Sequence, residues 1–378
     1  MICPYCGEEK GEEQFTDEHV LPRALGGGLQ PTNPFKLRVC HGCNAICGLH
    51  VDGPVVRSWL LRLSRAGVRF DVLAPQAPPI PLQFMGRLDE WADETICDYW
   101  IGPTGDSIFH FHAPYPGEST MVGGAPGLKP RDLDPGVVFV EVVASNPVWH
   151  PIIARSVRDA FDGAPIHVVN GSRAGAHPPY PPVPPELERH LSWVKALPLE
   201  REAGISLDLT CGQRFTAKLG LGFGAIFLGA QYQESADAVA IRKYMRSREA
   251  AERASLNLRG KALLSAPCDS DKRFVATFGW QKCHTFALLP MGDTLSLVAV
   301  LYGAHAMMIC LTSEHRLWRD RVSDGGIAWM VSPGTRTFVG PTSVPEMLVD
   351  IAQEVPTGPL AALHAQLFVI PEPPPVHL

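Results

Sequence analysis

Two cysteine pairs near the N-terminus restrict the fold of this chain more than any other feature of its sequence. Cys3-Pro-Tyr-Cys6 and Cys40-His-Gly-Cys43 both have the CxxC spacing, in which a tight turn directs two sulfur atoms toward one ion. Two such turns complete a tetrahedral site, a geometry that suits Zn²⁺. Because four thiolates leave no open coordination position, we expect this zinc ion to be structural.

Disulfide bonds are not the expected explanation for the ten cysteines of the chain. The N-terminal residues lack the basic region and apolar stretch of a secretory signal, so we expect a cytoplasmic protein with reduced thiols. A redox-active CxxC needs only one pair in a thioredoxin-like context, and buried free thiols are the remaining alternative. The spacing of Cys47 favours a small buried residue over a fifth ligand. The other cysteines are scattered: Cys97, Cys211, Cys268, Cys283 and Cys310.

The composition is that of a folded globular protein with two or three domains. With 378 residues, 46% hydrophobic and 19% charged, the chain is too apolar to be disordered throughout. Its formal net charge of -6 excludes a globally basic nucleic-acid coat, although a local basic face remains compatible with it. The most apolar window, Leu295–Thr312, is interrupted by Gly303 and His305, so it predicts a buried hairpin and no membrane span.

An ordered set of motifs lies between and after the cysteine pairs. Asp17-Glu18-His19-Val20 is followed by the glycine run Gly26–Gly28 and by Asn33, and Asn44 stands directly after Cys43. Together with the CxxC pairs, these motifs resemble the HNH endonucleases over roughly residues 1–55. The resemblance implies a ββα-metal fold and metal-dependent hydrolysis of DNA, in an enzyme of bacterial or phage restriction or defence type.

Phosphodiester hydrolysis needs a base that deprotonates water and a cation that offsets charge on the leaving oxygen. The imidazole of His19 titrates near neutral pH and suits the role of base. By resemblance, Glu18 matches the acidic ligand of the divalent ion, with Asp17 as an alternative ligand. Strand alternation directs Glu18 away from the side of His19, so a shared ion requires a strong local bend.

Two asparagines complete the resemblance. Asn33 matches the middle residue of the motif, where it is expected to hold the loop by side-chain to backbone hydrogen bonds; an ordinary turn residue is the alternative. Asn44 matches the third position and is expected to offer its amide oxygen to the ion; a helix N-cap is the alternative. Oxygen ligands from Glu18 and Asn44 favour Mg²⁺ or Mn²⁺.

The whole chain predicts an α+β protein, in which a zinc-stabilised ββα-metal (HNH, treble-clef-like) module precedes a larger mixed α/β region. Proline-rich stretches divide it into a nuclease module with an exit helix at 1–72, a β-rich domain at 80–177 and an α/β domain at 186–370. In the last domain we expect helices at Phe215–Leu228 and Ser235–Leu258 and strands at Ile205–Thr210, Arg273–Phe278, Thr285–Leu289, Leu295–Tyr302 and Ala306–Thr312.

Two further groups of residues carry functional hypotheses. The helix predicted at Ser235–Leu258 is the most basic stretch, and Arg242, Lys243 and Arg246 are expected to line a DNA track; a solvated charged helix is the alternative. In the β-rich domain, His110 and His112 share one face of a predicted strand. Because no acidic or cysteine partner is apparent, they favour ordinary sheet histidines over a second metal site.

Together these features predict a metal-dependent HNH endonuclease that acts on DNA, with a C-terminal recognition or regulatory region. The alternative is a zinc-stabilised module that binds DNA or protein without catalysis. A ligand of the C-terminal region and assembly into homo-oligomers are both compatible with the sequence.

Overall fold

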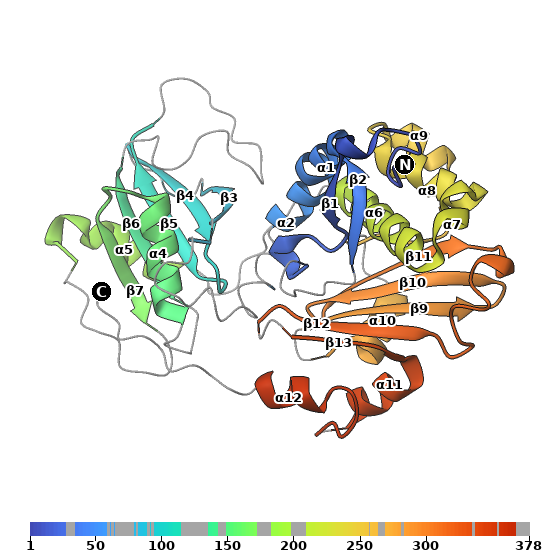
Figure 1. Cartoon of the computed structure of the whole chain (residues 1–378). Helices are drawn as coiled ribbons and strands as arrows, with labels where there is room; N and C mark the ends of the chain where they lie inside the picture. Colours follow the sequence, from blue (N-terminus) through green and yellow to red (C-terminus); the bar gives the residue numbers. More distant parts are fainter. Residues whose placement is uncertain are drawn as a thin grey trace. The chain divides into compact units, whose positions relative to one another are not determined.

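The computed structural model divides the chain into two compact units, which we describe separately (Figure 1). The first unit combines Met1–Arg69 with Asp208–Ile370, and the second combines Phe70–Leu207 with Pro371–Leu378. The structure describes residues 1–27, 35–58, 61, 64, 79–80, 82–88, 91, 94–114, 135–142, 149–171, 183–197, 209–256, 258–263, 269–280, 283–334, 337–353 and 355–367.

A β-hairpin followed by a helix forms the N-terminal part of the first unit. β1 (Phe15–His19) pairs antiparallel with β2 (Lys36–Cys40), and α1 (His41–Cys47) begins directly after β2. The helical path continues through η3 (Gly48–Asp52) into α2 (Gly53–Arg57). This ββα order confirms the predicted N-terminal module, and the sheets and helices of the remaining chain confirm the mixed α+β class.

A six-stranded antiparallel sheet forms the C-terminal part of this unit, in the order β13-β12-β9-β10-β11-β8. Its β10–β11 hairpin coincides with the most apolar window of the sequence and is largely buried, which confirms the predicted hairpin. The strands are β8 (Gly260–Lys261), β9 (His284–Met291), β10 (Thr294–Leu301), β11 (His305–Thr312), β12 (Ile327–Ser332) and β13 (Thr337–Ser343).

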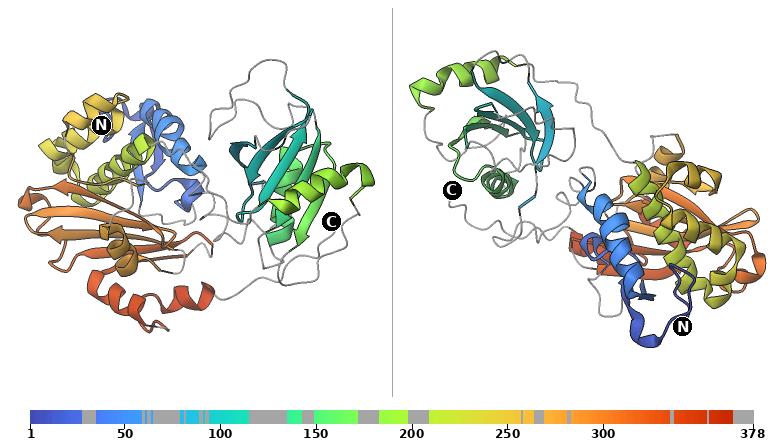
Figure 2. Two further views of the ribbon diagram at one scale, coloured as in Figure 1. Left: turned by 180° about the vertical axis from the view of Figure 1, so that it is seen from behind. Right: turned by 90° about the horizontal axis from the view of Figure 1, so that it is seen from above.

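Helices pack against both faces of this sheet, so its central strands are apolar on both sides. α6 (Leu209–Leu228) contacts β2 on one side and β11 on the other, and it lies between the hairpin and the sheet (Figures 1 and 2). The opposite face packs against α10 (Asp269–Phe278), α11 (Val344–Ala352) and α12 (Ala361–Leu367). None of the described helices combines the length and the apolarity that a bilayer crossing requires.

The N-terminal module and the sheet share one hydrophobic core. Phe35, just before β2, is 1% exposed, and its ring centroid lies 4.9 Å from that of Phe223 in α6. Phe286 of β9 and Trp329 of β12 complete the contact, with centroids 5.6 Å and 6.0 Å from that of Phe35. A hairpin with short helices buries too little apolar surface to be stable alone, so this packing supplies stability that the module lacks.

The shared core changes the predicted division into domains. The sequence predicted consecutive domains at 1–72, 80–177 and 186–370, whereas the structure groups most of the first and the third in one unit. Proline-rich stretches indicate where a chain is extended. They do not indicate which flanking segments pack together, because that depends on contacts between residues far apart in the sequence.

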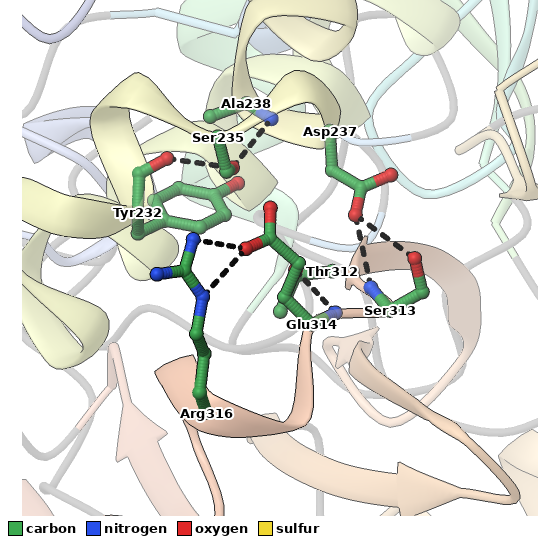
Figure 3. Close-up of polar contacts among 8 residues, drawn as sticks. All are labelled: Tyr232, Ser235, Asp237, Ala238, Thr312, Ser313, Glu314 and Arg316. Carbon is green, nitrogen blue, oxygen red and sulfur yellow. Dashed lines mark hydrogen bonds and ion pairs between the residues drawn. The ribbon is translucent and has the colours of Figure 1, made fainter.

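Three short helices follow α6: α7 (Ala230–Glu234), α8 (Ala236–Arg246) and α9 (Ala250–Ser255). The hydroxyl of Ser235 caps α8, accepting from the backbone nitrogen of Ala238 at 3.2 Å and donating to the carbonyl of Tyr232 at 2.7 Å (Figure 3). The Asp237 carboxylate accepts from the backbone nitrogen of Ser313, just after β11, at 2.9 Å (Figure 3). The bond of Asp237 attaches the start of α8 to the end of β11.

Three predicted elements differ from the structure. Ile205–Thr210 was expected to be a strand, but its last two residues begin α6, and the residues before them lie outside the described part. Arg273–Phe278 belongs to α10, because its apolar residues face the sheet at helical spacing. The helix predicted over Ser235–Leu258 is interrupted after α8, where Ser247 has extended backbone with ψ of 132°.

The second unit is a five-stranded sheet in the order β3-β4-β5-β6-β7. β3 to β6 are antiparallel, whereas β7 is parallel to β6 and is reached through α4. α4 (His150–Ala160) packs on one face and α5 (Glu188–Ala196) on the other. The strands are β3 (Gln83–Arg87), β4 (Ile96–Ile101), β5 (Ser107–His112), β6 (Val137–Val142) and β7 (Ile166–Gly171).

A glycine in α6 permits the close approach of this helix to the N-terminal module. A Cβ atom at Gly222 would lie 2.5 Å from Cγ1 of Val20, whereas one at Gly48 of η3 would meet nothing within 4 Å. We therefore expect Gly222→Val to lower the free energy of unfolding by about 1–3 kcal/mol, the usual cost of overpacking. Gly48→Val, the control, should change it by less than about 0.5 kcal/mol. Urea denaturation followed by circular dichroism measures both, and equal stabilities would contradict this packing.

Candidate functional site

Four cysteine side chains converge at one end of the hairpin: Cys3, Cys6, Cys40 and Cys43. Their sulfur atoms all lie within 4.8 Å of one another, and those of Cys6 and Cys40 are 4.0 Å apart. Tetrahedral zinc with Zn–S bonds of about 2.3 Å places its sulfurs about 3.8 Å apart, so the group fits a structural zinc ion. Cys47 is buried and lies outside this group.

Local backbone geometry brings these sulfurs together. The first turn closes through a hydrogen bond from the nitrogen of Gly7 to the carbonyl of Cys3 at 2.7 Å, and Gly7 has a φ of 77°. Cys40 ends β2, and Cys43 lies in the first turn of α1. A side-chain hydrogen bond between Cys3 and Cys43 lowers the pKa of the Cys3 thiol and raises the pKa of the Cys43 thiol, so these two sulfur atoms interact directly.

α8, the first part of the basic helix predicted to contact DNA, packs against the cysteine turns. Arg242 is buried and donates from Nε to the carbonyl of Pro4 at 2.9 Å and from Nη2 to that of Gln233 at 2.8 Å. Nη1 of Arg246 lies 3.6 Å from Sγ of Cys43, where a cation offsets thiolate charge. Of the three residues predicted to bind DNA, Lys243 and Arg246 are exposed, and their contact with DNA stays a prediction. Arg242 is buried, and its hydrogen bonds give it a structural role.

The imidazole of His19 is held by a backbone carbonyl. Its Nδ1 lies 3.0 Å from the carbonyl oxygen of Gly27, and because a carbonyl only accepts, Nδ1 carries the proton. In the neutral ring the lone pair is therefore on Nε2. Burial lowers the pKa of His19 below 6.5, and the nearby cations Arg23 and Lys36 lower it further, while the bond to Gly27 opposes this. At neutral pH His19 is thus an uncharged base.

The residues paired across the hairpin surround His19 with positive charge. In the register of β1 and β2, His19 is opposite Lys36, and Asp17 is opposite Arg38. Opposed side chains of an antiparallel pair project from the same face, and Lys36 and Arg38 are both exposed. Asp17 compensates part of this charge, since its Oδ2 lies 3.7 Å from Nζ of Lys36. Sequence reasoning missed these cations because the register depends on pairing across the loop.

Glu18 projects from the opposite face of β1 into the interior and is 5% exposed. Its Oε1 lies 2.6 Å from Nζ of Lys218, a residue of α6 whose side chain is 0% exposed. The same ammonium donates to Oδ2 of Asp52 at 3.0 Å and to the carbonyls of His19 and Val20 at 3.1 Å and 2.9 Å. We call these two carboxylates and Lys218 the buried ion cluster.

Opposite charges in this cluster counteract the effect of burial on Lys218 and Asp52. Burial by itself lowers the pKa of Lys218, but Asp52 and Glu18 outweigh it and hold that pKa above 10.5. Burial raises the pKa of Asp52 to about 6, against the stabilising charge of Lys218. Nearby, burial raises the pKa of Tyr5 well above 10 and that of Cys47 to about 12, so both side chains are neutral. The carboxylates of Glu18 and Asp52 balance the charge of Lys218.

Of the two asparagines of the motif, the structure describes Asn44. The side-chain nitrogen of Asn44 donates to the carbonyl of Asp17 at 3.3 Å and so links α1 to β1. Asn44 lies within α1, preceded in the helix by His41, so it is not the N-cap. Asn33 lies outside the described residues. The assignment of Glu18 and Asn44 to a divalent ion stays a prediction, although the structure directs the Glu18 carboxylate to Lys218.

The second unit provides a partner for one of its strand histidines. His112 has Nε2 3.0 Å from Oδ2 of Asp98 on the neighbouring strand β4 and Nδ1 2.8 Å from the carbonyl of Ala113. His110 stacks beside it, with ring centroids 4.5 Å apart. Asp98 is the acidic partner that sequence reasoning did not find. Among the described residues, the four N-terminal cysteines are the group identified as arranged to hold a metal ion.

Comparison with protein families agrees with this geometry. The family model described as HNH endonuclease matches residues 3–60. The matched segment contains the four cysteines, the hairpin and the helices through α2, and it implies a nuclease-type function with a zinc site. The comparison with curated proteins gives no match, and neither does the comparison with solved structures.

Removal of a zinc ligand should destabilise the entire first unit, because the module shares its core with the sheet. We expect Cys40→Ser to lose zinc and to lower the urea midpoint of the first unit, whereas Cys310→Ser, the control, keeps one zinc per chain. Structural zinc contributes on the order of 10 kcal/mol to folding in small peptides, so the shift should be large. Atomic absorption and circular dichroism measure zinc and unfolding. Full zinc content in Cys40→Ser would contradict the site.

Proposed function

We propose that this protein is an HNH endonuclease that hydrolyses phosphodiester bonds of DNA, with His19 as the general base. The observation that carries the proposal is the hydrogen bond of 3.0 Å that fixes Nδ1 of His19 on Gly27, within a hairpin next to a four-cysteine zinc site. The match of residues 3–60 to the HNH endonuclease family supports the same reading. A restriction or defence role in bacteria or phage is the corresponding biological proposal.

The chemistry assigned to His19 follows from its tautomer. With the proton on Nδ1, the lone pair of Nε2 accepts a proton from water as the water oxygen bonds to phosphorus. The bond between phosphorus and the 3′ oxygen then breaks, and the 3′ oxygen takes a proton from solvent. One fragment ends in a 3′ hydroxyl and the other carries a 5′ phosphate. Gly27 fixes the ring at the distance of a hydrogen bond, and a Cβ atom there would lie 1.6 Å from the carbonyl oxygen of Leu21, so glycine is required at this position.

Cations on the same face suit a phosphate substrate. Lys36 and Arg38 project beside His19, and Arg23 is exposed at the start of the following 3-10 helix. Each offers a charged donor for a phosphate oxygen. This arrangement favours the hairpin over helix α8 as the DNA-contacting surface, in a protein whose overall charge is negative.

The sequence predicted a catalytic Mg²⁺ or Mn²⁺ ion on Glu18 and Asn44, and these two residues as placed do not fit one ion. The Glu18 carboxylate is buried against Lys218 on one face of β1, whereas Asn44 donates to the carbonyl of Asp17 from α1. A divalent ion would also meet the positive charge of Lys218. We therefore assign no step of hydrolysis to an ion held by this pair.

A binding module without catalysis is the alternative function. It would keep the zinc site, the shared core and the cations of the hairpin, but it would have no use for a neutral imidazole held in one tautomer. The two functions therefore differ in the consequence of removing His19.

Replacing the base tests the proposed activity. We expect His19→Ala to reduce cleavage of supercoiled plasmid by about 10²–10⁴-fold, the usual contribution of a general base. Zinc content and DNA affinity should stay at wild-type values, because the zinc ligands and the aromatic residues of the shared core are other side chains. His41→Ala, an exposed histidine in α1, serves as control and should cleave normally. Equal cleavage by His19→Ala and wild type would exclude His19 as the base.

Charge reversal distinguishes the two candidate DNA surfaces. The pair Lys36→Glu and Arg38→Glu should weaken DNA binding and lower the slope of log K against log salt by about 1.8, or about 0.9 for each lost phosphate contact. Lys243→Glu on α8 should leave both nearly unchanged. Fluorescence anisotropy at several salt concentrations measures affinity and slope. A larger loss for Lys243→Glu would place the DNA on α8, as the sequence predicted.

A further inference from the structure

Lys218 occupies a position that has the character of a cation site. Four oxygen atoms surround its Nζ at 2.6–3.1 Å, two from carboxylates and two from backbone carbonyls. All four belong to the N-terminal module, from β1, the residue after it and η3, whereas the ammonium comes from α6. Carboxylate and carbonyl oxygens in this number are the ligands that hard cations such as Mg²⁺ and Ca²⁺ select.

The ammonium uses its full hydrogen-bonding capacity at this position. Its three N–H groups donate to Oδ2 of Asp52 and to the carbonyls of His19 and Val20, and the Glu18 carboxylate adds the closest ionic contact. The backbone of α6 lies close to the module at this point, because Gly222, one turn after Lys218, packs directly on Val20. A divalent ion at Glu18 would have to displace Lys218 from a site where that side chain is completely buried.

We propose that the Lys218 ammonium fills the cation position at Glu18, so that Glu18 and Lys218 are positioning residues for His19 and Glu18 is not a ligand of a divalent ion. The inference rests on the proposed function for the role of His19, but the occupancy of the Glu18 position is independent of catalysis. The C-terminal region, which contains Lys218, would then help to form the site itself, in addition to the recognition or regulatory role that the sequence predicted.

The positioning acts on the backbone of the base. Lys218 donates to the carbonyls of His19 and of the residue after it, while Gly27 accepts from the imidazole ring. The main chain and the side chain of His19 are therefore each fixed by a separate partner. The ion pair with Glu18 fixes the same strand one residue earlier, since Glu18 precedes His19 in β1.

Binding of Mn²⁺ to the zinc-loaded full chain tests the occupancy of the Glu18 position. We compare wild type, Glu18→Gln, Lys218→Met and the double variant by electron paramagnetic resonance of free Mn²⁺. Glu18→Gln should bind Mn²⁺ with the stoichiometry and affinity of wild type, within about twofold. Lys218→Met leaves two carboxylates and two carbonyls around an unfilled position and should gain one Mn²⁺ site per chain. Adding Glu18→Gln to Lys218→Met should weaken that new site at least about tenfold.

Two results would overturn the proposal. The first is a loss of Mn²⁺ affinity of tenfold or more in Glu18→Gln, which would make Glu18 a ligand in the wild-type protein. The second is the absence of a new site in folded Lys218→Met. If Lys218→Met does not fold, Glu18→Gln decides, since the proposal requires this variant to keep wild-type Mn²⁺ binding.

Cleavage kinetics test the positioning role and separate it from the proposed function. Glu18→Gln should lower kcat less than tenfold without changing KM or the Mn²⁺ concentration that gives half-maximal rate. A rise of that concentration by tenfold or more contradicts the inference, because a metal ligand would have been lost. If the wild-type chain cleaves no DNA, the proposed function fails, while the Mn²⁺ binding comparison still decides whether Lys218 fills the position.

Discussion

The buried ammonium of Lys218 joins the two parts of the first unit and determines how the candidate site is built. It comes from the helix that covers the six-stranded sheet, and its oxygen partners all come from the hairpin module. Breaking a buried ion pair by removing one partner typically costs about 3–5 kcal/mol. The sheet and the module therefore depend on each other: the sheet presents the helix, and the helix fixes the strand that carries His19.

The zinc site and the ion cluster hold opposite ends of the same hairpin. The cysteine turns secure the end of β2 and the start of α1, and Arg242 and Arg246 of α8 pack against them. Lys218 secures the end of β1. The outer face of the hairpin carries the half-buried His19 at the Lys218 end, with Lys36 and Arg38 exposed beside it. Buried contacts on the other face of β1 support this face.

The sequence predicted the parts of this site that depend on local spacing. CxxC pairs identify zinc ligands because each pair forms its own turn, and the motif around His19 could be recognised because its residues are consecutive. The partner of Glu18 could not be predicted, because Lys218 lies 200 residues away on a helix that showed no sign of contact with the module. The contact of Arg242 with Pro4 could not be predicted for the same reason, because it joins residues far apart in the sequence.

The module and the sheet form one cooperative unit through the shared core and Lys218. Native-state hydrogen exchange of the zinc-loaded full chain tests this cooperativity. We expect the slowest amides of β1, α6 and β10 to exchange with the same free energy of opening, because these elements unfold together. If β1 opens at a free energy several kcal/mol below that of β10, the module unfolds independently and the two parts are not one cooperative unit.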